Sequence, residues 1–208
     1  MVGDANLSHF DLTHDDAEIV PFVQRAQARV RGGKLKLVGS PWSAPPWMKK
    51  NNHMNCDLGP PSCELKNDAG TRETWALYFS KFIDALQARN LEMWGVTVQN
   101  EPEAQTGNIV YEGMHFTPEL ERQFVRDQLG PRLRADHPDV RLLIYDHNKD
   151  HIVEWAQTLL GDNETAQYVW GTAFHWYVCS LASSRCFSTT IIRYSCSQAP
   201  LTLPFSFR

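Results

Sequence analysis

The sequence Trp94-Gly95-Val96-Thr97-Val98-Gln99-Asn100-Glu101-Pro102 begins as a short apolar run and ends in an amide, a carboxylate and a proline. A run rich in β-branched residues that is closed by a proline is typical of a strand. Glu101 is therefore expected at the end of a strand, where its carboxylate is a candidate acid/base group.

Helix-like and strand-like runs alternate on both sides of this stretch. Helices are expected at residues 15–31, 71–86, 117–129 and 152–160, and strands at residues 35–40, 93–98, 140–147 and 169–177. Such alternation predicts an α/β fold with parallel strands joined by right-handed crossovers. Two architectures satisfy it, an open doubly wound sheet and part of a (β/α)8 barrel.

Local signals define several of these boundaries. The first helix is expected to bury a face made of Ile19, Phe22, Val23, Ala26 and Val30 and to stop at Gly32-Gly33. Prolines at residues 41–46 exclude a helix there. Thr117 and Pro118 form an N-cap and first-turn signature, and Gly130-Pro131 is expected to interrupt the helix that follows.

Polar and aromatic residues gather at the expected C-terminal ends of all four strands. They are Trp42, then Asn100 and Glu101, then Asp146 and His147, and finally His175, Trp176 and Tyr177. A (β/α)8 barrel builds its active site on that face from the ends of several strands. No glycine-rich fingerprint follows any strand, so a nucleotide-binding open sheet has little support. The pattern favours the barrel.

Composition limits the remaining possibilities. The formal net charge is −4 and the basic residues are scattered, which gives no reason to expect a nucleic-acid partner. No run of about 20 apolar residues predicts a transmembrane helix. Residues 1–6 do not read as a signal peptide, whereas the sequons at Asn6 and Asn163 weakly favour secretion.

The five cysteines fall into two groups. Cys56 and Cys63 share one polar loop and could form a disulfide in an oxidising compartment. Cys179, Cys186 and Cys196 lie in residues 178–208, which hold no Asp or Glu and do not continue the strand and helix rhythm. This segment is expected to be a divergent, unstructured tail with no regular element after residue 192. The cysteine spacings do not match a zinc site.

Four motifs in order resemble glycoside hydrolase family 30, and within it the glucosylceramidases. They are GSPWSAPPWMK at residues 39–49, VTVQNEP at 96–102, FTPE at 116–119 and FHWY at 174–177. The resemblance implies a (β/α)8 TIM barrel and retaining hydrolysis of the β-glucosidic bond of glucosylceramide. It implies no metal and no organic cofactor, because an acid/base and a carboxylate nucleophile suffice.

The same resemblance assigns roles to individual residues. It implies that Glu101 is the acid/base, that Asn100 binds the sugar 2-hydroxyl, that Trp42 lines the glucose pocket, and that His175 and Tyr177 shape the pocket near the nucleophile. Alternatives remain for three of them, since Glu101 could be a surface carboxylate, Trp42 a core residue and His175 a structural histidine. Tyr111 is a looser match to an aromatic that relatives place in this loop.

The resemblance covers only part of a barrel. The four strands correspond to about the third to the sixth, so residues 1–177 are expected to be a partial barrel domain and residues 178–208 a separate tail. The family's nucleophilic glutamate ends the seventh strand and is expected to be missing from this chain. The chain alone is therefore expected to be unstable and inactive.

Several functional alternatives stay open at this level. The substrate could be a β-glucan or a xylan, because the fold does not determine the aglycone pocket, or the chain could bind a glycolipid without turnover. Family relatives imply a lysosomal or secreted location, a lipid-presenting helper protein and peripheral contact with a membrane.

Overall fold

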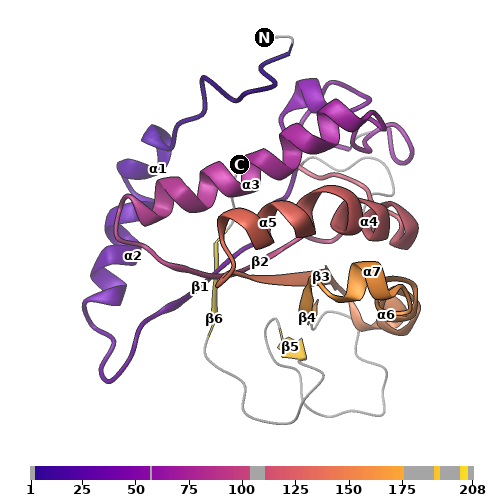
Figure 1. Ribbon diagram of the computed structural model, residues 1–208. Coiled ribbons are helices and arrows are strands. Elements are labelled where there is room, and N and C mark those ends of the chain that lie inside the picture. Colours follow the sequence, from indigo (N-terminus) through magenta and orange to yellow (C-terminus); the bar gives the residue numbers. More distant parts are fainter. Residues whose placement is uncertain (1–2, 57, 104–110, 176–189, 193–201, 206–208) are drawn as a thin grey trace.

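The computed structural model describes residues 3–56, 58–103, 111–175, 190–192 and 202–205 (Figure 1). Four neighbouring parallel strands form the centre of one sheet. They are β1 (Lys36–Gly39), β2 (Met93–Thr97), β3 (Arg141–His147) and β4 (Val169–Phe174). Strand neighbours in the sheet are also neighbours in the sequence, in the order β1-β2-β3-β4. The sheet is that of a partial TIM barrel, one of the two architectures that the alternation of elements allows.

Helices precede β1, connect the strands β1 to β4 and cover one face of the sheet (Figure 1). They are α1 (Thr13–Asp16), α2 (Ile19–Gln27), α3 (Ala69–Gln87), α4 (Pro118–Phe124), α5 (Gly130–Asp136), α6 (Ile152–Leu160) and α7 (Asn163–Ala166). Short 3-10 turns lie at Pro46–Met48 and Lys149–His151. Asp68 caps α3 and Thr117 caps α4. In each case a side-chain oxygen of the cap residue accepts a hydrogen bond from a backbone N–H in the first turn of the helix.

The two faces of the sheet have different partners. On the helix side, Leu37, Val96, Leu142 and Ile144 join the main core. Three aromatic residues of α3 are fully buried there: Trp75, Phe79 and Phe82. On the opposite face, a smaller cluster contains Val38, Leu143 and Ala173, with the rings of Trp94 and Trp170 packed against it. We call this the concave face, because it corresponds to the inside of a barrel. Apolar residues on both faces are characteristic of a parallel sheet that is covered on both sides.

The expected helix at residues 15–31 is wrong in its limits and in its buried face. The helical segment is broken between α1 and α2 and ends at Gln27. Val20 and Val23 are buried, whereas Phe22 is 61% exposed and Val30 37% exposed. The apolar spacing identified a helix, but the face that it buries depends on docking against the end of α3, where Gln24 Nε2 donates to the Arg89 carbonyl at 2.9 Å.

Two proline-based expectations are also corrected. Pro46 begins a 3-10 turn, because the first helical position needs no N–H and suits the fixed φ of proline. Gly130-Pro131 does not interrupt its helix, since a five-residue π-helical segment, Val125–Leu129, joins α4 to α5. There the Gly130 N–H donates to the Val125 carbonyl, a wider turn that accommodates the proline ring.

Two further strands lie in the region that is expected to have no regular structure. β5 (Thr190–Ile192) pairs antiparallel with β4, and β6 (Thr202–Phe205) pairs parallel with β1, so the sheet order is β5-β4-β3-β2-β1-β6. Pro204 lies within β6, which is an edge strand and therefore tolerates proline. The expectation of no strand after residue 192 is therefore wrong. The domain boundary at residue 177 stays a prediction.

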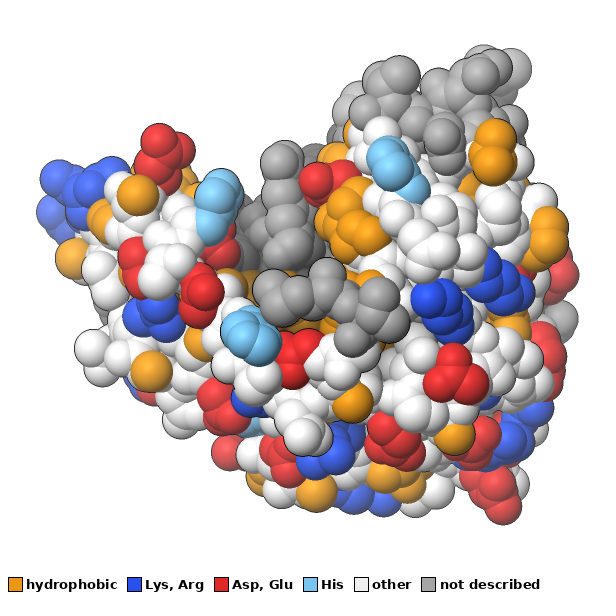
Figure 2. Space-filling view, turned by 90° about the horizontal axis from the view of Figure 1, so that it is seen from above, with side chains coloured by type: hydrophobic (Ala, Val, Ile, Leu, Met, Phe, Trp, Pro, Cys, Tyr) orange, Lys and Arg blue, Asp and Glu red, His pale blue; other side chains and the backbone are white. Residues whose placement is uncertain are grey.

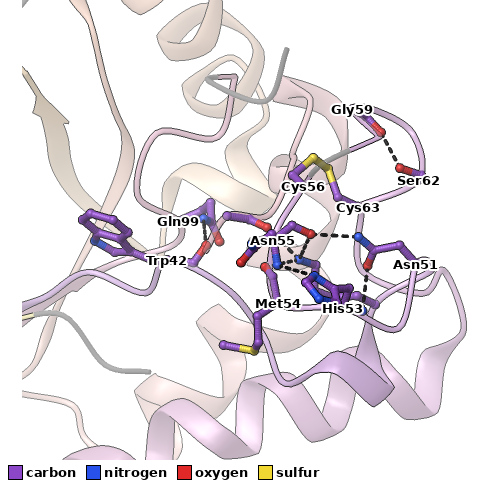
Figure 3. The surroundings of a disulfide bond; sticks show 12 residues. Trp42, Asn51, His53, Met54, Asn55, Cys56, Gly59, Ser62, Cys63 and Gln99 are labelled. Atoms are coloured by element: carbon purple, nitrogen blue, oxygen red, sulfur yellow. Dashed lines mark hydrogen bonds between the residues drawn. A yellow bond between two sulfur atoms is a disulfide. The ribbon is translucent and has the colours of Figure 1, made fainter. Parts of the chain in front are cut away.

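The long loop between β1 and α3 is held by a disulfide and by hydrogen bonds. Cys56 and Cys63, both fully buried, form a disulfide (Figure 3). The Lys49 ammonium is also fully buried and donates to the Met54 and Gly113 carbonyls at 2.7 and 2.6 Å. The loop thus packs against residues 112–115, which follow Tyr111 in the chain.

Candidate active site

The strand ends are joined by backbone hydrogen bonds beyond the last ladder pairs. The Asn100 N–H donates to the Pro41 carbonyl at 2.8 Å, and the Glu101 N–H donates to the Asp146 carbonyl at 2.9 Å. At the next strand, the His175 N–H donates to the His147 carbonyl at 2.7 Å. The sheet therefore continues as a connected rim on which the predicted site residues of four strands lie side by side.

His175 bridges two carboxylates on this rim. Its Nδ1 lies 3.0 Å from Glu101 Oε1, and its Nε2 lies 3.1 Å from Asp146 Oδ1. Burial of the imidazole lowers its pKa, but the hydrogen bonds and charges of Asp146 and Glu101 outweigh burial and raise the pKa of His175 to about 9. Below that pH the ring is protonated, so both nitrogens donate and the ring orients Glu101.

Asp146 is held on its other oxygen. Thr97 Oγ1 donates to Asp146 Oδ2 at 2.8 Å, and the Ser40 hydroxyl donates to the same oxygen. The Asp146 side chain is only 3% exposed. One oxygen of Asp146 thus contacts His175, and the other accepts hydrogen bonds from two hydroxyls. Asp146 is therefore held in place and can orient the His175 ring. The sequence does not single out Ser40 and Thr97. Ser40 follows β1 directly, Thr97 is the last residue of β2, and their hydroxyls meet at the same oxygen of Asp146.

The backbone at the site adopts a conformation that side chains rarely take. Glu101, Tyr145 and Asp146 have φ angles of 46°, 76° and 56°, in the left-handed region. Such residues cost about 1–3 kcal/mol each and cluster at functional sites, where the surrounding structure enforces them. The left-handed conformation of Glu101 occurs four residues after the end of β2.

Trp42 and Asn100 lie on the same rim. The Trp42 ring is half-buried and meets the Tyr111 ring edge to face, with centroids 5.7 Å apart. Tyr111 is 42% exposed. Buried Gln99, which the sequence did not identify, donates to the Trp42 carbonyl at 2.7 Å (Figure 3). It also donates to the Asn100 carbonyl at 2.9 Å. Tyr177 lies outside the described residues.

Glu103, a second carboxylate near Glu101, contacts a histidine outside the site. Both oxygens of Glu103 lie 3.1 Å from His151 Nδ1, and this contact raises the pKa of His151. His147 is buried beside the site, and burial lowers the pKa of its ring. Neither Glu103 nor Asp146 is therefore arranged as a nucleophile opposite Glu101.

The described surface carries charges of both signs. On the face in Figure 2, acidic and basic side chains are interspersed over the residues that are described. Within the described ranges, no cluster of three or more His, Cys, Asp or Glu side chains has an arrangement that could hold a metal ion. None of the described helices combines the length and apolar character needed to cross a bilayer.

Comparison with known proteins identifies the fold family. The model of the glycosyl hydrolase family 30 TIM-barrel domain matches residues 1–193. Lysosomal acid glucosylceramidase of Mus musculus is 38% identical over 187 residues, which is 88% of this chain and 35% of the mouse protein. Endo-1,6-beta-D-glucanase neg1 of Aspergillus fumigatus is 33% identical over 150 residues, covering 69% of this chain and 30% of that protein.

A solved structure agrees with both the sequence and the fold. SrfJ from Salmonella typhimurium superposes with a TM-score of 0.72 at 29% identity, covering 85% of this chain and 38% of SrfJ. The chain therefore spans about a third of the length of the relatives that it matches. With four consecutive parallel strands, their helices and the family model in agreement, the chain belongs to glycoside hydrolase family 30 and forms part of its TIM barrel.

Proposed function

We propose that the protein containing this chain is a retaining β-glucosidase that acts on glucosylceramide, with Glu101 as its acid/base. The observation that carries the proposal is the placement of Glu101 at the end of β2, with its carboxylate held by His175 at 3.0 Å. The similarity to the mouse glucosylceramidase supports the choice of substrate.

The proposed chemistry gives each rim residue a role. Glu101 protonates the leaving oxygen of the glycoside and later takes a proton from the attacking water. Asn100 binds the sugar 2-hydroxyl, a contact that strengthens in the transition state. The rings of Trp42 and Tyr111 form an aromatic wall for the apolar face of the sugar. Tyr177 completes the pocket in this proposal.

The retaining mechanism requires a second carboxylate about 5 Å from the acid/base. Asp146 is buried and hydrogen-bonded on both oxygens, so it does not supply this group. We assign the nucleophile to a residue that these 208 positions do not contain. The 208-residue chain by itself then forms no glycosyl-enzyme intermediate.

The test is hydrolysis of a fluorogenic β-glucoside and of glucosylceramide at acid pH by the whole protein. Glu101→Gln is expected to lower kcat about 10²–10⁴-fold, because the substitution removes the proton that the leaving group needs. Glu119→Gln is the control, since Glu119 is 53% exposed on α4 and pairs with Arg122. Full activity of Glu101→Gln would refute the role of Glu101.

A second substrate class has specific support. The Aspergillus relative is named an endo-1,6-β-glucanase, and the acid/base and fold leave the aglycone pocket undetermined. Assays on glucosylceramide, β-1,6-glucan and xylan in parallel separate these candidates. Binding of glucosylceramide without turnover by the whole protein would instead favour a non-catalytic glycolipid-binding role.

The lysosome is the proposed location, by similarity to the mouse protein, whose name places it there. In that setting a small lipid-presenting protein and peripheral contact with a membrane deliver the glycolipid. Co-localisation of the tagged protein with a lysosomal marker tests the location, and a secreted protein would contradict it.

A further inference from the structure

The C-terminal half of β3 breaks the alternation that its N-terminal half establishes. Leu143 lies in the concave-face cluster, and Ile144 lies in the helix-side core. Strict alternation would send Tyr145 to the concave face and Asp146 to the helices. Instead Tyr145 packs in the helix-side core, its ring 5.3 Å from that of Trp155, and Asp146 reaches the concave face.

A β-bulge produces this inversion. The pairing of β3 with β4 shifts register between Tyr145 and His147, at the two consecutive residues with φ angles of 76° and 56°. An extra residue in one strand reverses the direction of every side chain that follows it. Without the bulge, the carboxylate of Asp146 would point away from Ser40, Thr97 and His175.

The backbone N–H of Tyr145, at the bulge, donates its hydrogen bond to a side chain of helix α4. Glu121 lies on α4 and is fully buried, and its Oε1 accepts the Tyr145 N–H at 3.0 Å. Its Oε2 has no hydrogen-bond partner among the described residues. Burial, together with the charges of Asp146 and Glu103, raises the pKa of Glu121 to about 8 against the opposing effect of the Tyr145 bond. A buried acid of this kind is costly to retain unless its acceptor atom is needed.

We propose that Glu121 is a positioning residue for the acid/base site. By accepting the Tyr145 N–H, its carboxyl maintains the bulge that turns Asp146 to the concave face, where Asp146 orients His175 toward Glu101. The effect passes through one backbone hydrogen bond and two side-chain contacts, and Glu121 itself touches no reacting atom. The inference rests on the proposed function only in the role given to Glu101.

The test measures the His175 ring rather than activity. In the whole protein, with histidine labelled at Cε1 and the His175 signal assigned by its loss in His175→Asn, the ring pKa is read by NMR titration. Glu121→Gln keeps a carbonyl acceptor of the same size and is expected to leave the His175 pKa near 9. Glu121→Leu removes the acceptor, and the pKa is expected to fall toward the ordinary value of about 6.5.

A control variant and a second substitution of Glu121 complete the test. Glu119→Leu, on the exposed side of the same helix, is the control and is expected to leave the titration unchanged. If Glu121→Leu does not fold, Glu121→Asp withdraws the acceptor by one methylene, and a lowered His175 pKa in that variant supports the proposal. An unchanged pKa in a folded Glu121→Leu or Glu121→Asp variant overturns it. Failure of the proposed glucosidase activity would leave this titration and its interpretation intact.

Discussion

At the scale of single residues, His175 is the link between the strands. Its ring contacts Glu101 from β2 and Asp146 from β3, at 3.0 and 3.1 Å. A neutral imidazole has one donor and one acceptor nitrogen and cannot donate to both carboxylates, whereas a protonated ring can. The charge state of His175 therefore determines whether the rim is held together by two favourable hydrogen bonds.

The first pH prediction concerns the stabilising charge of His175. Its folded-state pKa of about 9 lies above the unfolded value of about 6.5. The contribution of this group to stability is thus fully present below pH 6.5 and is lost as pH rises through about 9. Chemical denaturation across that range is expected to show a declining free energy of unfolding. His175→Gln should flatten the decline, and the exposed control His14→Gln should not.

The second pH prediction concerns Glu121. Burial raises its folded-state pKa to about 8, from an ordinary value near 4.5, so the folded state binds the proton more tightly. The stability of the fold is expected to fall as pH rises from about 4.5 to 8. Glu121→Gln, which stays neutral, should be more stable than the parent at pH 8, by roughly 2–4 kcal/mol. Equal stabilities at pH 8 would show that the carboxyl ionises without penalty.

At the scale of elements, the α4–α5 connection depends on a close approach. A Cβ added to Gly130 would lie 2.4 Å from Tyr168 Cγ and 2.6 Å from the Val125 carbonyl oxygen. The π-helical segment that ends here contributes buried Val125 and Leu129 to the core. This glycine is therefore a packing requirement, and the following proline is tolerated because the helix is widened at that point.

Substitution of this glycine has a predictable cost. Gly130→Ala is expected to destabilise the protein by about 1–3 kcal/mol, because the added methyl group must displace an aromatic ring and a backbone carbonyl. Gly33→Ala is the matched control, since a Cβ added at Gly33 would meet nothing within 4 Å. Urea denaturation of both variants measures the difference. A Gly130→Ala protein as stable as Gly33→Ala would show that Tyr168 moves freely.

At the scale of the whole molecule, the sheet has one face covered by helices and a second, concave face. The concave face carries Val38, Leu143 and Ala173, with the half-buried rings of Trp94 and Trp170 4.9 Å apart. Arg141 lies over both rings at 4.8 and 5.4 Å. In a closed barrel these side chains fill the interior.

The isolated 208-residue chain is therefore expected to be unstable. Compared with the whole protein, it should bind a hydrophobic dye more strongly, aggregate at lower temperature and show no measurable β-glucosidase activity. The reason is that the described part of its sheet leaves the apolar concave face without the strands that close a barrel. Dye fluorescence, light scattering and a fluorogenic glucoside assay measure the three effects. Hydrolysis by the isolated chain that is abolished in Glu101→Gln would contradict the prediction.

The order of strands and helices and the strand-end position of Glu101 follow from the sequence by itself. These features depend on the spacing of apolar residues along the chain, on capping residues such as Thr117, and on apolar runs that end at polar residues. Proline signals were less reliable, since Pro46 begins a 3-10 turn and Pro131 lies in a helix that is widened just before it.

Only the tertiary structure decided which side chains meet. Ser40, Thr97 and Glu121 carry no local signal, because their importance comes from partners 24 to 106 residues away. The bulge at Tyr145 and Asp146 reverses the alternation that the sequence implies, and it is stabilised by a carboxyl from a different element. The sequence determined the presence of Glu101 at the rim, and long-range contacts determined how that carboxylate is held.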